Sequence, residues 1–193
     1  MYKSLISLSL ILVTQIGYAA VWELNTNKSS LNFESTKNTT ITEENKFKQF
    51  TGTIDDKNAT AKFDVSLNSV DTRIPVRDER IRELLFETAR YPIASFTTQF
   101  DTKYISELSD NKPHTIPVDG TLNLHGVEHK ITSQVIAQQL DANTLQIKNA
   151  EPIVLNTDDY NLGAGVAALT KIAGLQSIDS SVPVSFTLIF DKK

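Results

Sequence analysis

Cysteine is absent from all 193 residues of the chain. This absence excludes disulfide bonds, thiol catalysis, cysteine-held metal sites and attachment of a lipid through an N-terminal cysteine. Glycine and proline are also few, at seven and six residues, and no Gly/Ser/Pro-rich linker or repeat divides the chain. We therefore expect one domain that is stabilised by packing alone.

An excess of positive charge is missing as well. The formal net charge is −4 at pH 7, and it becomes more negative if Lys3 is lost with a leader segment. Because a negatively charged protein repels polyanions, the composition argues against nucleic acid as a partner.

Long apolar runs are confined to the N-terminus. A positively charged start precedes an apolar stretch over residues 5–16, which ends in small residues at Gly17 and Ala19. The stretch is shorter than the roughly 20 apolar residues that span a bilayer, and small residues at these two positions suit cleavage after Ala19. We expect a cleaved signal peptide over residues 1–19 rather than an anchor, and a mature single domain over residues 20–193.

Alternation of apolar and polar residues dominates the mature chain, and this is the period of half-buried β-strands. The alternating runs occupy residues 31–35, 59–68, 94–100, 120–124, 131–137 and 182–190, with shorter candidates at 21–24, 50–54 and 145–154. Turn-forming residues such as His125-Gly126 lie between the runs. So many evenly spaced strands predict an all-β barrel or sandwich.

Two segments change to helical spacing. Residues 78–88 place Ile81 and Leu85 on one face with charges elsewhere, and Asp78 is suited to cap or enter the first turn. Small residues dominate a second helical candidate over residues 164–175. We expect one short helix near 78–88 and a second near 164–175.

Motifs that would indicate catalysis, a metal or a cofactor are weak. The glycine pattern at residues 163–168 lacks the βαβ context of a dinucleotide site. His125 and His129 flank a predicted turn, and Asp158 with Asp159 lacks the pattern of a calcium loop. No serine lies in a nucleophile-elbow sequence. We expect no catalytic residues, no metal and no cofactor.

Ordered motifs along the mature chain resemble the YceI-like family. The central signature comprises Ser69–Thr72, Arg77–Glu79, Leu85–Phe86 and Tyr91–Phe96. Further pieces follow the order of the family: Trp22 with residues 30–33, Phe47–Gly52, Gly120–Val127 and Val182–Phe190. The resemblance covers essentially all of the mature chain.

This resemblance implies an extended lipocalin-like antiparallel β-barrel of about eight strands in the bacterial periplasm. It also implies that the interior binds a long apolar ligand, such as a polyisoprenoid, an isoprenoid quinone or a fatty-acid-like lipid. Transient contact with a membrane would accompany loading of the ligand. The protein could be a monomer or a homodimer, and the resemblance leaves both possibilities open.

The apolar phases of the strands predict which side chains line the cavity. They are Phe33, Phe63, Val65, Phe96, Phe100, Leu122, Leu124, Phe186 and Leu188. Arg73 and Arg77, close to a strand-to-helix junction, are predicted to bind a charged head group through charge-assisted hydrogen bonds. The alternative for these arginines is a solvated helix in which glutamates are their partners.

Two other classes of function remain open. An enzyme acting on a lipid or quinone would need Asp64, His125 or Tyr160 to point into the barrel, against the outward phase of Asp64. A stress-protective interaction protein would have a packed core and an exposed apolar patch. A cavity would distinguish a carrier from a stress-protective interaction protein. A cluster of polar side chains inside the barrel would instead indicate an enzyme.

Overall fold

The computed structural model describes residues 21–108 and 111–193, so the expected signal peptide lies outside the described residues. The strands are β1 Val21–Leu24, β2 Ser30–Lys37, β3 Ile41–Phe47, β4 Phe50–Asp55, β5 Thr60–Ser66, β6 Val70–Asp71, β7 Ile93–Gln99, β8 His114–Leu124, β9 Val127–Asp141, β10 Thr144–Asn149, β11 Ile153–Asn156 and β12 Ser181–Lys192. The α-helices are α1 Pro75–Arg80, α2 Lys103–Glu107 and α3 Gly163–Ile172. Shorter turns are the 3₁₀ segments η1 Thr26–Lys28, η2 Leu67–Ser69 and η5 Thr157–Tyr160, and the π-helical segment η3 Ile81–Leu85.

The sheet closes on itself. Eight strands pair in the order β1-β4-β5-β7-β8-β9-β10-β12, and β12 pairs with β1 in turn, so that every neighbouring pair is antiparallel. This is the closed antiparallel barrel that the sequence predicts, and closure satisfies the edges that an open sheet would leave unpaired.

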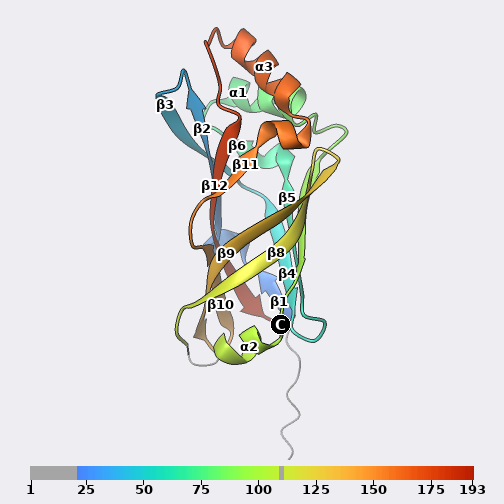
Figure 1. Cartoon of the computed structure of the whole chain (residues 1–193), viewed down its shortest axis with the longest axis vertical. Helices are drawn as coiled ribbons and strands as arrows, with labels where there is room; N and C mark the ends of the chain where they lie inside the picture. Colours follow the sequence, from blue (N-terminus) through green and yellow to red (C-terminus); the bar gives the residue numbers. More distant parts are fainter. Residues whose placement is uncertain (1–20, 109–110) are drawn as a thin grey trace, which may run out of the picture.

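The barrel is extended at one end. The first part of β12 leaves β1 and β10 and pairs instead with β2 and β11, while β3 and β6 continue the sheet beyond β2. Figure 1 shows α1 and α3 together at this end and α2 at the opposite end of the barrel. No helix among residues 21–108 and 111–193 has the length and apolar character needed to cross a membrane.

Alternation decides which side chains face inward. Along β5, Phe63 and Val65 contribute to the interior, whereas Asp64 lies outside the cavity lining. Asp64 forms an ion pair of 2.6 Å with Lys62, whose side chain is mostly exposed although the residue also borders the cavity. Apolar residues pack inside because burial removes their surface from water, and charged residues keep their hydration outside. The interior and exterior faces of this strand follow the phase that the sequence indicates.

The helices begin and end at positions that differ from the expected ones. The expected helix at 78–88 begins at Pro75, whose fixed φ and missing N–H suit the first turn, and it continues as the π-helical segment η3. Asp78 lies in the first turn, but its carboxylate accepts hydrogen bonds from the Thr72 backbone N–H at 2.8 Å and from the Thr72 hydroxyl at 2.5 Å. Asp78 therefore ties the helix to the preceding segment.

Some further elements also differ from the strand and helix expectations. The run at 145–154 is two strands, β10 and β11, because Pro152 cannot donate to a continuous ladder. Strand β3 and helix α2 were not expected. Most residues of β3 are polar, so its sequence shows no clear alternation of apolar and polar side chains. Helix α2 has only five residues, which is too short to show a helical pattern of apolar residues.

Candidate ligand-binding cavity

A cavity of about 680 Å³ occupies the interior of the barrel. Inward side chains of β2, β4, β5, β7, β8, β9, β10 and β12 form its wall, and most of them are apolar. Ligand sites in proteins commonly have volumes of about 300–1,000 Å³ and mainly apolar linings. The interior can therefore hold a sizeable apolar molecule, and a fully packed core is excluded.

All nine residues predicted for the cavity wall line this space. They are Phe33, Phe63, Val65, Phe96, Phe100, Leu122, Leu124, Phe186 and Leu188. They come from five different strands and the loop after β7, so only barrel closure brings them together. Their contact with a ligand stays a prediction.

Side chains of α2 and its flanking residues line the cavity at one end of the barrel. Phe100, Tyr104 and Leu108 line the cavity there, and Leu108 is buried. Figure 1 shows α2 beneath this end of the barrel.

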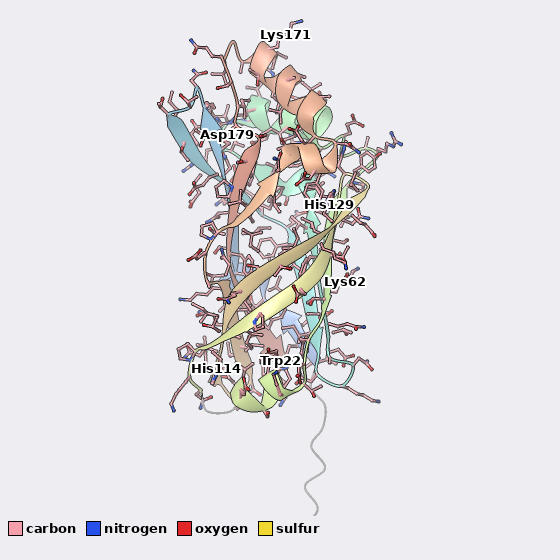
Figure 2. The ribbon with its side chains drawn as sticks, viewed as in Figure 1. Trp22, Lys62, His114, His129, Lys171 and Asp179 are labelled. Atoms are coloured by element: carbon pink, nitrogen blue, oxygen red, sulfur yellow. The ribbon has the colours of Figure 1, made fainter. Side chains whose placement is uncertain are left out.

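The opposite end carries an opening. Ile74, Val76 and Ile172 line the cavity, yet they are 44%, 52% and 50% exposed to solvent. A residue that contacts both the interior and the solvent marks an entrance, and we call these three residues the mouth. Figure 2 places Lys171 and Asp179 at the same end of the molecule.

Arg77 is a charged residue of the cavity wall. Its Nη1 donates to Glu43 Oε2 at 2.6 Å, and its Nη2 donates to the carbonyl oxygen of Thr72 at 2.7 Å. Lys37 Nζ lies 2.6 Å from the same Glu43 oxygen. The hydrogen bond from Lys37, with that from Arg77, lowers the pKa of the Glu43 carboxyl. Two cations thus share one ionised carboxylate.

Arg73 lies outside the cavity lining. Its Nη2 donates to the carbonyl oxygen of Glu44 at 2.5 Å, and its backbone N–H donates to Asp71 Oδ1 at 2.9 Å. Its φ of 64° turns the chain sharply ahead of α1. The sequence analysis predicted both arginines as head-group residues. In the structure Arg77 lines the cavity and Arg73 does not.

Asn45 on β3 is a polar wall residue that the sequence analysis missed. It is 4% exposed, and its Nδ2 donates to Ser35 Oγ and to the Glu43 carbonyl oxygen, each at 3.2 Å. Its Oδ1 is buried without a hydrogen-bond partner among the described residues. Asn45 lies two residues before Phe47 on β3, so both side chains point to the same face of the strand, and Phe47 lines the cavity. This spacing is the sequence feature that could have identified Asn45.

Tyr160 and Thr157 form a second polar part of the wall. Tyr160 is 2% exposed, and its ring meets the His129 ring edge-on at a centroid distance of 5.1 Å. Burial, with a smaller effect from the nearby Asp159 charge, raises the pKa of the Tyr160 hydroxyl. Thr157 is also buried, and its Oγ1 lacks a partner within the described chain.

The three residues considered for an enzyme do not converge. Asp64 accepts a hydrogen bond from Ser95 Oγ at 2.6 Å outside the lining, and the His125 ring packs against Tyr91 at 4.4 Å. Only Tyr160 lines the cavity. The three residues nominated for catalysis therefore do not face one interior space together.

The histidines and carboxylates of the described residues 21–108 and 111–193 do not form a metal site. No group of three His, Cys, Asp or Glu side chains in these ranges is arranged to hold a metal ion. His125 turns toward Tyr91, and His129 turns toward Tyr160. The two histidines therefore contact different aromatic rings.

The fold and the cavity together define a class: a closed antiparallel barrel with one large apolar interior site, typical of lipocalin-like binding proteins rather than enzymes. The chain belongs to the YceI-like domain family, which matches residues 22–190. No curated protein matches the chain.

Solved structures agree with this assignment. A domain from Saccharophagus degradans, described as polyisoprenoid binding and implicated in plant cell wall breakdown, is 35% identical with a TM-score of 0.86. The similarity covers 89% of this chain and 98% of that one. BcnA from Burkholderia cenocepacia shares the fold at 20% identity and a TM-score of 0.66, over 86% of this chain and 98% of that one. A YCEI protein from Campylobacter jejuni shares it at 15% identity and 0.55, over 77% and 84%.

Proposed function

We propose that the protein is an exported periplasmic carrier that holds a long apolar ligand, a polyisoprenoid or a related lipid, inside the barrel. The apolar cavity that opens at one end is the observation that carries this proposal. Similarity to the polyisoprenoid binding domain of Saccharophagus degradans supports the class of ligand. The lipid is the ligand itself, and the proposal includes no cofactor.

The energetics of such a carrier depend on the state from which the ligand comes. Burial of an apolar chain is worth about 0.8 kcal/mol per CH₂ relative to water. A ligand with tens of carbons would exceed the ceiling of about 18–21 kcal/mol for noncovalent binding if water were the reference. In a membrane the ligand already lies in hydrocarbon, so most of this free energy cancels. A dry cavity then permits both loading and release.

Loading takes place at the mouth in this proposal. Ile74, Val76 and Ile172 are exposed apolar side chains that are continuous with the cavity wall. Contact of these residues with a bilayer would let a lipid pass into the barrel without crossing water.

Flotation of the protein with phosphatidylcholine vesicles tests this contact. We expect Val76→Asp together with Ile172→Asp to reduce the bound fraction, whereas Val154→Asp, at an exposed residue outside the cavity lining, should not.

Extraction of the native protein tests the proposed function directly. The protein is purified from its exported location, native mass spectrometry is recorded gently, and organic extracts are examined for lipid. We expect a co-purifying apolar lipid of defined mass. The same spectrum reports whether the protein is a monomer or a homodimer. Its mass also shows whether the chain is cleaved after Ala19, which tests the expected signal peptide. Repeated extracts without any lipid would contradict the carrier proposal.

A variant that fills the cavity provides a second test. Val184 on β12 lines the cavity, and Ser185 beside it does not. We expect Val184→Trp to reduce the amount of retained lipid, because the indole occupies space that the ligand needs. Ser185→Trp is the matched control, and it should retain lipid at the level of the unchanged protein. Equal lipid content in both variants would contradict the assignment of the cavity as the binding site.

A further inference from the structure

Three cavity-lining residues carry a buried polar atom without a partner in the described chain, namely Asn45, Arg77 and Thr157. The atoms of Asn45 and Arg77 share Glu43 as a neighbour and have opposite hydrogen-bonding character. Asn45 Oδ1 can only accept a hydrogen bond, and Arg77 Nε–H can only donate one. Both residues line the cavity. A buried polar group without a partner costs about 1–3 kcal/mol, so the pair is expected to have a partner when a ligand is present.

Shared neighbours hold the two residues in one part of the wall. Asn45 Nδ2 donates to the Glu43 carbonyl oxygen, and Arg77 Nη1 donates to the carboxylate of the same Glu43. Arg77 Nη2 donates to the Thr72 carbonyl oxygen. Strands β3 and β6 pair Lys46 with Asp71, which places Asn45 opposite Thr72 when the register is continued. We call Asn45 and Arg77 the polar pair.

The orientation of the Asn45 amide follows from its contacts. One of its two donor contacts is to the Glu43 carbonyl oxygen, which can only accept. A flipped amide would place its own oxygen against that carbonyl oxygen and lose the bond. The unpartnered atom of Asn45 is therefore the acceptor Oδ1.

We propose that the polar pair recognises a neutral hydroxyl group on the ligand, so that the preferred ligand is a long-chain isoprenoid alcohol or quinol. This inference rests on the proposed carrier function. A hydroxyl accepts a hydrogen bond from Arg77 Nε and donates one to Asn45 Oδ1, and thus satisfies both atoms at once. An ether or a quinone carbonyl has no proton to donate, and it would leave Asn45 Oδ1 without a partner.

The surrounding charges disfavour a diphosphate head group. Arg77 and Lys37 already share the carboxylate of Glu43, and the carboxylate of Asp78 lies close by on Thr72. A diphosphate at the polar pair would therefore meet two carboxylates and the acceptor oxygen of Asn45, while Arg77 and Lys37 already bind Glu43. Like charges at close range in a cavity of low polarity repel strongly. Arg80 is a further cation of the cavity lining, so the diphosphate is one of the ligands compared below.

The experiment compares matched ligands in the purified full chain after its own lipid has been removed. Geranylgeraniol, its methyl ether, its diphosphate and the corresponding hydrocarbon compete with a fluorescent lipophilic probe. We expect the alcohol to bind about tenfold more tightly than the ether, because the ether leaves one buried acceptor unpaired. The diphosphate should bind less tightly than the alcohol.

Variants separate recognition from folding. Asn45→Leu should bind alcohol and ether equally while it keeps the affinity for the hydrocarbon, which shows that the cavity is intact. Arg77→Lys, which keeps the positive charge but lacks Nε, should also lose most of the preference for the alcohol. Glu44→Leu, at an exposed position next to Asn45 on the same strand, is the matched control and should keep that preference.

Each outcome decides between the hypotheses. A preference for the alcohol that disappears with Asn45→Leu and persists with Glu44→Leu supports the inference. Equal affinities for alcohol and ether in the unchanged protein, or tightest binding of the diphosphate, would overturn it and leave the carrier function standing. Failure of all four compounds to displace the probe would overturn the inference and the carrier function together.

Discussion

The ring of Phe96 lies directly against the backbone of Gly120 on the neighbouring strand. A β-carbon at position 120 would lie 2.6 Å from the carbonyl oxygen of Thr97 and still closer to the Phe96 ring. Gly120 on β8 pairs with Thr98 on β7, so the two strands approach each other where the aromatic ring crosses. Glycine at 120 therefore allows Phe96 to take its place in the cavity wall.

Substitution Gly120→Ala tests this contact. We expect the free energy of unfolding to fall by about 1–3 kcal/mol, because the added methyl group forces the ring or the strand to move. Urea denaturation followed by circular dichroism measures the change. Combining Gly120→Ala with Phe96→Leu should recover part of the loss, since the smaller side chain frees the space. A double variant whose losses simply add would show that the ring is not the cause.

Gly165 in α3 has a similar role at the mouth. A β-carbon there would lie 2.5 Å from the Leu84 carbonyl oxygen and 2.7 Å from Leu85 Cα, so α3 packs closely on η3. We expect Gly165→Ala to displace α3 and destabilise the protein by about 1–3 kcal/mol. Hydrogen exchange should quicken in α3 and η3 before the barrel strands. Ala164→Ser at the exposed neighbouring position is the control, and equal exchange in both variants would contradict this packing argument.

The ion cluster around Glu43 predicts a dependence on acid. The pKa of Glu43 is lowered in the folded protein below its usual 4.5, so its contribution to stability is present above that pH and is lost as the pH falls through the folded pKa. We expect Glu43→Gln to be less stable at neutral pH by no more than about 1 kcal/mol, because the carboxylate is partly exposed. The difference should vanish in acid. Urea midpoints measured between neutral and acidic pH check this, and a constant difference would contradict it.

The buried hydroxyl of Tyr160 predicts that the stability of the protein falls at alkaline pH. Its pKa is raised above the usual 10.0 by burial, so the associated stability is present below that pH and is lost as the pH rises through the folded pKa. We expect Tyr160→Phe, which has no proton to lose, to show a shallower decline in unfolding free energy above about pH 10. Parallel curves for the two proteins would show that other groups cause the alkaline loss.

The barrel strands could be predicted because each carries a clear two-residue period with one apolar face. Phe63 and Val65 line the cavity as their phase requires, and so do Phe186 and Leu188 on β12. The helix expected near residues 78–88 is present but begins earlier, at Pro75, because the fixed φ and missing N–H of proline suit the first turn. Sequence patterns within a segment predict whether it forms a strand or a helix better than they predict the residues at which it begins and ends.

Arg77 of the polar pair was among the predicted head-group residues, but Asn45 could not be predicted, for a reason that lies in β3. Glu43 and Asn45 occupy positions of the strand where other strands carry apolar residues, so the strand has no visible apolar period. The unsatisfied state of Asn45 Oδ1 depends on contacts with Ser35 and Glu43 that only the folded chain brings together. Likewise, Arg73 and Arg77 look equivalent in the sequence, and the turn between them sends only Arg77 to the cavity.

The sequence by itself determined that this chain is an all-β protein whose strands each have one apolar and one polar face, because alternation along a strand is a local property. The alternation alone left a barrel and a sandwich open, and the resemblance to the YceI-like family favoured the barrel. Only the tertiary structure decided that the centre is hollow, that Ile74, Val76 and Ile172 form its mouth, and that Asn45 and Arg77 lie in its wall. The same inward phases would serve a packed core equally well. Whether inward side chains meet or leave a space depends on how strands distant in sequence are spaced around the closed barrel, which no single strand specifies.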